Sequence, residues 1–358
     1  MFRFLLAVTL LMPLFASGFT PTHAPDHEDQ VMEKFLKPFG KGRFKHVPKA
    51  LREGDWLLGP RVFFKTTATF LIWQNTYSQA FYRHVEPLIR KHFPGLIYNK
   101  KYSHLYDKIY NEGFLNYLYI KKTFAMFNSD IDDALNVYFD VAHPIYDVLF
   151  DDPLFSDFNK EENINRITKI VSRDYNFENK TPLERLLIDV LENIDQRLPA
   201  SNKAAFYQVL RKLHFDQVDS IKQHDKNLSN EELRSIEFRK GGNSMVLYVL
   251  LNERSYSQEE LDAYFIMGAF LQSVDDFSDM EEDTEQGIET LAIRKLIVPE
   301  EQWLIRDIFM GQLFSFVDKY QYDYDEVSTF HDLVDKLMTM SAEKYQDSMD
   351  AISERKSP

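Results

Sequence analysis

The sequence predicts an all-α protein, and three observations support this. Apolar residues recur at three- and four-residue spacing from Trp56 onward, which is the period of an amphipathic helix. Glycine and proline are few, with 12 and 14 in 358 residues, so breaks between helices are short. No segment alternates apolar and polar residues long enough to indicate a sheet. We therefore expect a single helical bundle over residues 56–358.

The residues that precede this region have a different character. Residues 1–18 combine one basic residue with an apolar core and end in small residues, a pattern typical of a secretory signal peptide and shorter than a membrane span. We assign 1–24 as a signal-like or membrane-associating segment and 25–55 as a polar linker. A cleaved signal, an uncleaved segment in peripheral contact with a membrane and a misplaced start codon are all open. Removal of about the first 25 residues should leave the helical region folded and active. The alternative is that this segment packs over the cavity mouth as a lid, in which case truncation costs activity or solubility.

The elements follow in chain order from local signals. Residues 61–93 and 100–127 show helical spacing of apolar positions. Thr181 starts a capping box with proline at the first helical position, and Ser229 and Ser257 repeat the capping signal before two long apolar stretches. We therefore expect helices to begin at these three residues.

Composition excludes several classes of function. The net charge of −14 argues against a nucleic-acid surface, which needs clustered lysine and arginine. The absence of cysteine excludes disulfides, thiolate zinc sites and cysteine nucleophiles. The hydrophobic fraction of 44% is enough for a substantial core.

An acidic run over residues 275–283 is the most informative motif. It ends the apolar stretch 264–272, and Asp275, Asp279 and Asp283 fall at i, i+4 and i+8, on one helix face. Like charges at this spacing repel by a few tenths of a kcal/mol per pair, which a bound cation would relieve. Mg²⁺ prefers oxygen ligands of this kind. The alternative is a solvated acidic helix end.

A second carboxylate pair lies upstream. Asp147 and Asp151 are also four residues apart, and the apolar residues 148–150 between them predict a partly buried helix. Two helices that face each other with such carboxylates could hold a diphosphate bridged by Mg²⁺. An ordinary amphipathic helix is the alternative. If the first interpretation is right, all five acids of the two ladders converge on one cavity.

A glycine pair interrupts the helical stretch 231–251. Gly241 and Gly242 each cost about 1 kcal/mol in a helix interior, so they predict either a break or a close helix–helix contact. A break beside Arg239 and Lys240 would direct backbone donors toward an anion. The upstream polar face that contains Lys222 could reach the same cavity, or form a solvated surface.

These motifs carry a resemblance to a known family. Asp279-Met-Glu-Glu-Asp283 resembles the second metal motif of class I isoprenoid synthases, and Asp147-x-x-x-Asp151 is similar to the first motif in the spaced form of squalene and phytoene synthases. Tyr82-Arg-His-Val-Glu-Pro87 is similar to a string in the bacterial tetraprenyl-β-curcumene synthase family, which the chain resembles most. The likeness covers residues 75–295 as an ordered set of motifs.

The resemblance implies a fold, a cofactor and a site. The fold is the class I isoprenoid synthase bundle with a central active-site cavity, and the cofactor is a cluster of up to three Mg²⁺ ions. The implied catalytic residues are Asp147, Asp151, Asp279 and Asp283. The implied metal ligands are Asp147, Asp151, Asp275, Asp276, Asp279, Glu282 and Asp283. The implied diphosphate-binding residues are Lys222, Arg239, Lys240 and Gly241, and Lys344-Tyr345 is similar to a pair that closes over the diphosphate.

The expected function is Mg²⁺-dependent ionisation of a prenyl diphosphate to give a terpene. Two alternatives within the same chemistry are a prenyltransferase and a squalene- or phytoene-type coupling enzyme. Two others are a non-catalytic isoprenoid-binding protein and a phosphohydrolase of lipid diphosphates. The second class usually has His–Asp metal pairs, but neither acidic motif contains one, and His331-Asp332 lies far along the chain. A homodimer is compatible with the sequence. The signal-like segment favours export or membrane association, whereas the family chemistry favours the cytoplasm.

Overall fold

A computed structural model describes residues 73–94, 103–126, 131–151 and 159–355. This part of the chain folds into helices and contains no strand, which confirms the all-α prediction. The assignments made for 1–24 and 25–55 lie outside the described residues. So do residues 56–72, the start of the predicted helical region.

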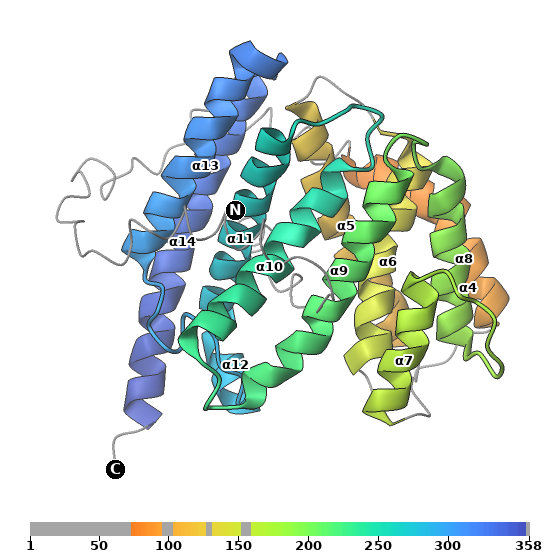
Figure 1. The fold of residues 1–358 in the computed structure, drawn as a ribbon, viewed down its shortest axis with the longest axis horizontal. Helices are drawn as coiled ribbons and strands as arrows, with labels where there is room; N and C mark the ends of the chain where they lie inside the picture. The colour runs from red at the N-terminus through yellow and green to blue at the C-terminus, as the bar shows by residue number, and fades with distance from the viewer. Residues whose placement is uncertain (1–72, 95–102, 127–130, 152–158, 356–358) are drawn as a thin grey trace.

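Figure 1 shows the helices packed side by side in one bundle, with α13 and α14 as an antiparallel pair along one edge. The main helices are α4 (Glu86–His92), α5 (Ser103–Ala125), α6 (Asp133–Asp151), α7 (Lys160–Val171), α8 (Pro182–Arg197), α9 (Lys203–Ser220), α10 (Asn230–Val249), α11 (Gln258–Ser278), α12 (Met280–Gln286), α13 (Pro299–Tyr320) and α14 (Tyr324–Arg355). A π-helical turn, η3 (Phe81–Val85), precedes α4, and a 3₁₀ turn, η5 (Ile221–His224), follows α9.

The three predicted helix starts are confirmed. The Thr181 hydroxyl accepts a hydrogen bond from the backbone N–H of Glu184, whose carboxylate accepts one from the Thr181 N–H at 2.6 Å. Ser257 forms the same reciprocal box at the start of α11. The Ser229 hydroxyl caps α10 at 3.1 Å from the N–H of Glu232. Each cap is worth about 0.5–2 kcal/mol, so the boundaries are set locally.

The middle of the bundle is the contact between α10 and α11. Residues 240–249 of α10 and 263–277 of α11 are all buried, and α10 packs more extensively on α11 than on any other described helix. A helix that is buried all round belongs to the centre of a domain. Helices α13 and α14 pack on α11 through aromatic rings. Between ring centroids, Phe309 of α13 lies 5.0 Å from Phe270 of α11, and Tyr345 of α14 lies 4.6 Å from Phe277 of α11.

The acidic ends of α6 and α11 lie at the same end of the bundle. The backbone N–H of Asp323, between α13 and α14, donates to the carbonyl of Met126 at 2.8 Å, and α6 begins at Asp133, shortly after Met126 in the chain. The Ser257 hydroxyl at the start of α11 donates to that of Tyr320 at the end of α13, at 2.8 Å. Since both helices start beside the α13–α14 connection, both end at the opposite end, the lower edge of Figure 1.

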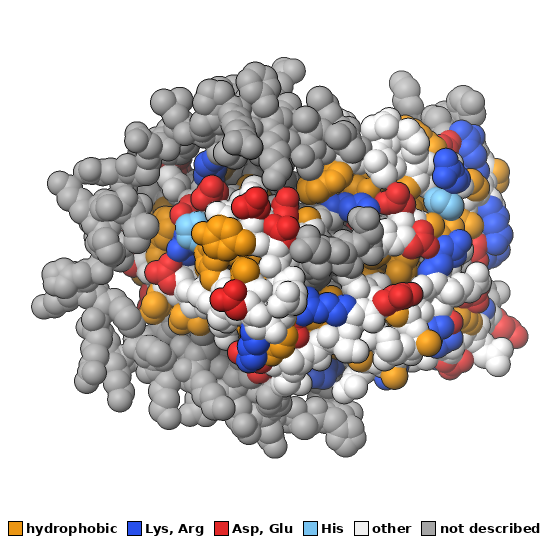
Figure 2. All heavy atoms as spheres, turned by 90° about the horizontal axis from the view of Figure 1, so that it is seen from above, with side chains coloured by type: hydrophobic (Ala, Val, Ile, Leu, Met, Phe, Trp, Pro, Cys, Tyr) orange, Lys and Arg blue, Asp and Glu red, His pale blue; other side chains and the backbone are white. Residues whose placement is uncertain are grey.

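Figure 2 shows the other end of the bundle. Hydrophobic, acidic and basic side chains are interspersed there, and lysine and arginine gather on the side occupied by α4 and α8. No helix in the described part of the chain is both long enough and apolar enough to cross a membrane.

Candidate functional site

Carboxylates gather where α11 ends and α12 begins. Asp275 and Asp276 lie in the last turn of α11 and are 3% and 5% exposed, and Asp279 and Asp283 follow at the junction and in α12, partly buried. The backbone N–H groups of Asp279 and Asp283 donate to the carbonyls four residues earlier, at 3.1 and 2.8 Å. These two hydrogen bonds keep the four-residue spacing across the junction, although Asp279 itself, with φ −105° and ψ 6°, separates α11 from α12. The predicted single helix is thus interrupted at Asp279, while the acids stay close enough to shift each other's pKa values. We call these four residues the acidic cluster.

Burial and mutual repulsion keep protons on Asp275, Asp279 and Asp283. Burial raises the pKa of Asp275 well above its usual range, and the Asp279 and Asp276 carboxylates raise it further. Burial raises the pKa of Asp279 to about 6, with the exposed Glu282 adding to the shift. Burial raises the pKa of Asp283 to about 7, with Asp276 adding to it. Near neutral pH these acids are therefore partly protonated.

Two lysines from other helices oppose this effect. Lys240 of α10 is 5% exposed, and its charge favours the ionised forms of Asp275, Asp279 and Asp283 by lowering their pKa values. Lys344 of α14 acts in the same way on Asp279. The two lysines thus bring positive charge to the acidic cluster from two sides. Lys240 and Lys344 were both predicted to serve a diphosphate, and both lie beside these acids.

Glu237 of α10 is a buried carboxyl that the sequence did not reveal. It is 1% exposed, and burial followed by the adjoining Asp276 carboxylate raises its pKa well above the usual range. Its Oε1 accepts hydrogen bonds from the backbone N–H of Leu291 at 2.9 Å and from Nε2 of Gln223 at 3.3 Å. Glu237 therefore contacts both the segment after α12, through the Leu291 N–H, and the acidic cluster, through Asp276. Its position one helical turn before Lys240 was the only sequence signal.

Two of the predicted diphosphate-binding cations are ion-paired between α9 and α10. Nε of Arg239 lies 2.8 Å from Oδ1 of Asp216, and Nη2 donates to Oδ2 of Asp219 at 3.3 Å. Nζ of Lys222 lies 2.6 Å from Oδ1 of Asp219 and 3.7 Å from Glu232. Arg239 and Lys222 thus link the end of α9 to α10 through these ion pairs. Their predicted role toward a diphosphate stays a prediction.

The predicted helix break at Gly241 and Gly242 is wrong. Helix α10 runs without interruption through both residues. A Cβ atom on Gly241 would collide with the backbone carbonyl of Gly268 in α11 and would lie 2.8 Å from Cβ of Gln272, and one on Gly242 would overlap the Phe265 ring. The glycines allow the two backbones to touch. Gly241 therefore lacks the exposed donors on which its predicted diphosphate-binding role depended.

The α6 acids have neighbours of their own. Asp147 is partly buried, and its Oδ2 lies 3.6 Å from Nδ1 of His143. Burial raises the pKa of Glu112 in α5 to about 8, and the charge of Asp147 adds to the shift. Asp151 is the last residue of α6, and its side chain lies outside the described part. The α6 carboxylate thus faces α5, where a second acid is held protonated.

The two predicted carboxylate ladders therefore lie at the same end of the bundle, but they form two separate groups of acids. The acids of the acidic cluster shift each other's pKa values, and Asp147 shifts that of Glu112. Their convergence on a single cavity stays a prediction.

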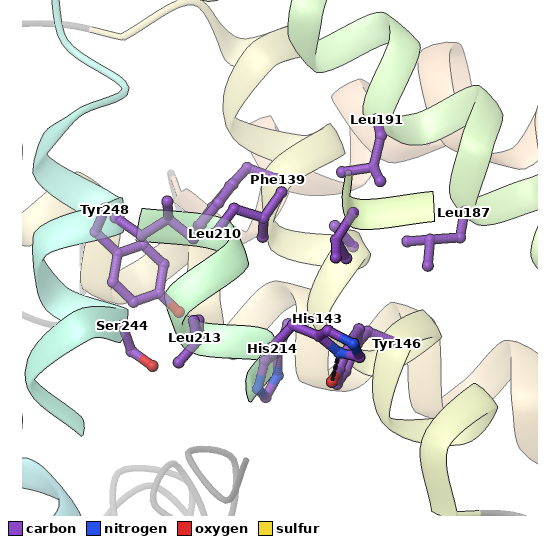
Figure 3. A pocket seen from close by; sticks show the side chains of 13 residues that line it. Phe139, His143, Tyr146, Leu187, Leu191, Leu210, Leu213, His214, Ser244 and Tyr248 are labelled. Carbon is purple, nitrogen blue, oxygen red and sulfur yellow. Dashed lines mark hydrogen bonds between the residues drawn. The ribbon is translucent and has the colours of Figure 1, made fainter. Parts of the chain in front are cut away.

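An apolar cavity adjoins α6. It encloses about 70 Å³ between α6, α8, α9 and α10, and most of its lining is leucine and aromatic side chains. Figure 3 shows His143, Tyr146 and His214 together at one end of it. Because Asp147 follows Tyr146 in α6, the first acidic motif begins at the wall of this cavity.

The acidic cluster has the donor chemistry of a divalent-cation site. Oδ1 of Asp275 is buried and has no hydrogen-bond partner among the described residues, whereas the Asp276 carboxylate accepts from Nε2 of Gln272 at 2.8 Å and shares a hydrogen bond with Glu237. A buried carboxylate oxygen without a donor fits a hard cation, which would also remove the repulsion that raises the pKa of Asp275. Within the described ranges, however, no three His, Asp or Glu side chains already stand in metal-binding geometry. The acidic cluster therefore fits a divalent cation by the type of its donor atoms, by their burial and by the unpaired Oδ1 of Asp275.

No family model, curated protein or solved structure matches this chain. What the fold and the site define together is an all-α bundle with a buried acidic cluster at one end.

Proposed function

We propose that this protein is a class I terpene synthase-like enzyme that ionises a prenyl diphosphate in the presence of Mg²⁺. The observation that carries the proposal is the acidic cluster, with the raised pKa values of Asp275, Asp279 and Asp283 and the buried, unpaired Oδ1 of Asp275. A protein that keeps such acids buried at its core does so against the cost of repulsion and desolvation, which is typical of a functional site. The class I fold type and the Mg²⁺ cofactor are part of this proposal.

The residues of the cluster have distinct roles in the proposed mechanism. Asp275, Asp279 and Asp283 would hold Mg²⁺ on the α11–α12 face, with Asp276 and Glu282 beside them and Asp147 and Asp151 as a second set of ligands. Bound Mg²⁺ supplies Lewis-acid stabilisation of the diphosphate leaving group. Lys240 and Lys344 add fixed positive charge where negative charge develops as the C–O bond breaks.

The apolar cavity supplies the second half of the proposed reaction. Its leucine and aromatic walls would exclude water from an allylic cation, but its volume of about 70 Å³ is smaller than a prenyl chain, so the bundle would have to open around it to admit the substrate. Aromatic ring faces such as that of Phe139 attract positive charge. Of the proposed metal ligands, Asp147 is the one placed beside this cavity, because it follows Tyr146 in α6.

A coupling enzyme is the second candidate. The four-residue spacing of Asp147 and Asp151 is the observation that favours it, because this spaced form resembles the first motif of squalene and phytoene synthases. Such an enzyme would use the same acids and would transfer the cation to a second prenyl substrate.

The test is incubation of the purified chain with C10 to C25 prenyl diphosphates, with Mg²⁺ or with a chelator. Diphosphate release and organic products are measured together. A cyclic or linear hydrocarbon supports the synthase, a longer prenyl diphosphate the coupling enzyme, and plain prenol a phosphohydrolase. Binding without release in the presence of Mg²⁺ would overturn the enzymatic proposal in favour of an isoprenoid carrier.

A further inference from the structure

A groove lies on the surface between the end of α4 and the start of α8. Its volume is about 450 Å³, which is within the range of small-molecule sites and larger than the apolar cavity of about 70 Å³. It belongs to the side of the bundle where Figure 2 shows lysine and arginine gathered. Its lining includes three cations, Lys91, Lys180 and Arg185, and two acids, Asp189 and Glu192. We call it the α4–α8 groove.

The groove is more positive than the chain as a whole, whose net charge is −14. Nζ of Lys91 donates to Oδ2 of Asp189 at 2.6 Å, and Nε2 of His92 lies 2.7 Å from the same oxygen. Burial opposes the ionised form of Asp189, but the hydrogen bonds from Lys91 and His92 lower its pKa below the ordinary value. The Asp189 carboxylate is therefore charged and already compensated from α4.

The other two cations of the groove have no carboxylate partner in the described part of the chain. Nε and Nη2 of Arg185 donate to the backbone carbonyl of Lys180 at 2.9 and 2.6 Å, which fixes the plane of the guanidinium. Nζ of Lys180 donates to the carbonyl of Phe177 at 2.5 Å and lies 4.5 Å from the centre of its ring. Backbone carbonyls thus hold both cations in place without neutralising their charge.

Several hydrogen-bond donors of the groove remain open. Nη1 of Arg185 makes no hydrogen bond to a described residue, and the Lys180 ammonium has two protons beyond the one that it gives to Phe177. The hydroxyl of Tyr175, which also lines the groove, has no hydrogen-bond partner in this part of the chain either. The groove therefore offers a ligand two charged donors and one neutral donor.

We propose that the α4–α8 groove binds a phosphate group. Phosphate oxygens accept several hydrogen bonds at once, and the planar guanidinium of arginine and the point charge of lysine both suit them. Arg185 and Lys180 would bind the phosphate oxygens, and Tyr175 would donate a further hydrogen bond. Lys91, held by Asp189, would add positive charge from α4. The phosphate belongs either to a small soluble molecule or to a lipid headgroup, since the same donors serve both.

This site is separate from the acidic cluster and does not depend on the proposed function. Figure 1 places α4 and α8 at the edge of the bundle opposite α13 and α14, whereas the acidic cluster lies where α11 meets α12. The acidic cluster needs Mg²⁺ to hold a diphosphate, because carboxylates dominate it. The groove presents its cations directly, so its binding should persist in the presence of a chelator.

The first test is calorimetric titration of the full chain with inorganic diphosphate in the presence of EDTA. Arg185→Gln should weaken binding by about tenfold or more, since it removes a charge-assisted hydrogen-bond donor. Arg185 is exposed, so thermal unfolding should show an intact fold. Arg83→Gln is the matched control, because Arg83 is also exposed and lies directly before α4 but does not line the groove. The control should leave the affinity unchanged.

Glu192 provides a variant with the opposite expected effect. It is an exposed acid of the groove and repels an anionic ligand. Glu192→Gln should therefore strengthen diphosphate binding by up to about fivefold, the usual size of an interaction between exposed charges. A purely structural role of the groove would not produce a gain in affinity.

The second test identifies the source of the phosphate. Vesicles of phosphatidylcholine, with or without phosphatidic acid, are sedimented with the unmodified protein and with both arginine variants. Sedimentation that requires phosphatidic acid, and that is lost in Arg185→Gln but kept in Arg83→Gln, supports a lipid headgroup. Diphosphate binding without sedimentation supports a soluble phosphorylated ligand.

Two results would overturn the proposal. One is the absence of binding both to diphosphate and to vesicles that contain phosphatidic acid. The other is equal weakening by Arg185→Gln and Arg83→Gln, which would show only a general attraction of anions to this side of the bundle. Neither result bears on the proposed function, whose test requires Mg²⁺ and turnover of a prenyl diphosphate.

Discussion

A Cβ atom added to Gly268 would collide with the backbone carbonyl of Gly241, so α10 and α11 cross with their main chains in contact. The nearest atoms on both sides of this crossing are backbone, which cannot rotate away as a side chain can. The two most buried helices of the bundle are therefore held at a separation that only glycine permits.

Gly268→Ala should consequently destabilise the protein by about 1–3 kcal/mol, the usual cost of overpacking a core. Gly311→Ala in α13 is the matched control, because that glycine is exposed and an added Cβ meets no atom within 4 Å. In the control, alanine should stabilise the helix by up to about 1 kcal/mol. Denaturant unfolding measures both, and equal effects of the two substitutions would contradict the close crossing.

Local signals predicted the helices well because capping and periodicity act within one turn. Helices begin at Thr181 and Ser257 as predicted, because the capping partner of each residue lies only three residues away in the chain. The structural role of Gly241 could not be predicted from local signals. Its contact partner, Gly268, lies on another helix, and the sequence alone cannot distinguish a break from a crossing.

For the candidate site, too, the sequence predicted what depends on spacing within one segment and missed what depends on contacts between helices. The grouping of Asp275, Asp279 and Asp283 follows from their four-residue spacing, which two backbone hydrogen bonds keep across the helix junction at Asp279. The burial of Glu237 and the pairing of His214 with Tyr146 depend on α9, α10 and α6 coming together in space. No spacing rule within one helix reports such contacts, so these residues were missed.

Replacement of one member of the acidic cluster should have opposite effects on stability and on activity. Asp279→Asn removes a carboxylate whose charged form is disfavoured by burial and by Glu282, so the metal-free protein should become more stable at pH 8. The same change removes a proposed Mg²⁺ ligand, so diphosphate release should fall by at least about 100-fold. Thermal unfolding and a diphosphate assay give the two values.

Asp318→Asn is the control for this experiment, because Asp318 is an exposed acid on α13. It should change neither stability nor release. Unchanged diphosphate release in Asp279→Asn would count decisively against the proposed site.

The stability of the metal-free protein should fall as the pH rises from about 4 to about 7. An unfolded chain binds protons on aspartate with a pKa of about 4, whereas burial in the folded protein raises the pKa of Asp279 to about 6 and that of Asp283 to about 7. The folded protein therefore holds more protons than the unfolded one over this range, and linkage makes unfolding easier as they leave.

Mg²⁺ should reverse this trend, because its binding needs deprotonated carboxylates. Its stabilising effect should be larger at pH 7.5 than at pH 5.5, with melting temperatures measured at both pH values with and without the ion. Equal stabilisation by Mg²⁺ at both values would show that the ion binds elsewhere.

Arg239 and Lys240 are neighbours in α10 and should respond differently to truncation. Nε of Arg239 lies 2.8 Å from Oδ1 of Asp216, a carboxylate that is 1% exposed, and Arg239→Ala would remove a charged partner of this buried group. Loss of one partner of a buried pair costs about 3–5 kcal/mol, so this variant should unfold at a lower denaturant concentration. Restoring neutrality with Asp216→Asn in the same chain should recover part of the loss, which a double-mutant cycle measures.

Lys240→Met should instead act mainly on function. Its charge lowers the pKa values of Asp275, Asp279 and Asp283, so its removal should raise them further and shift Mg²⁺ binding to higher pH. The affinity for inorganic diphosphate should fall by about tenfold or more, since a buried cation near the leaving group is lost. Calorimetric titration of diphosphate and a denaturation curve, run on both variants, separate the two roles. A Lys240→Met protein that loses stability as Arg239→Ala does, and binds diphosphate normally, would assign Lys240 to the structural network as well.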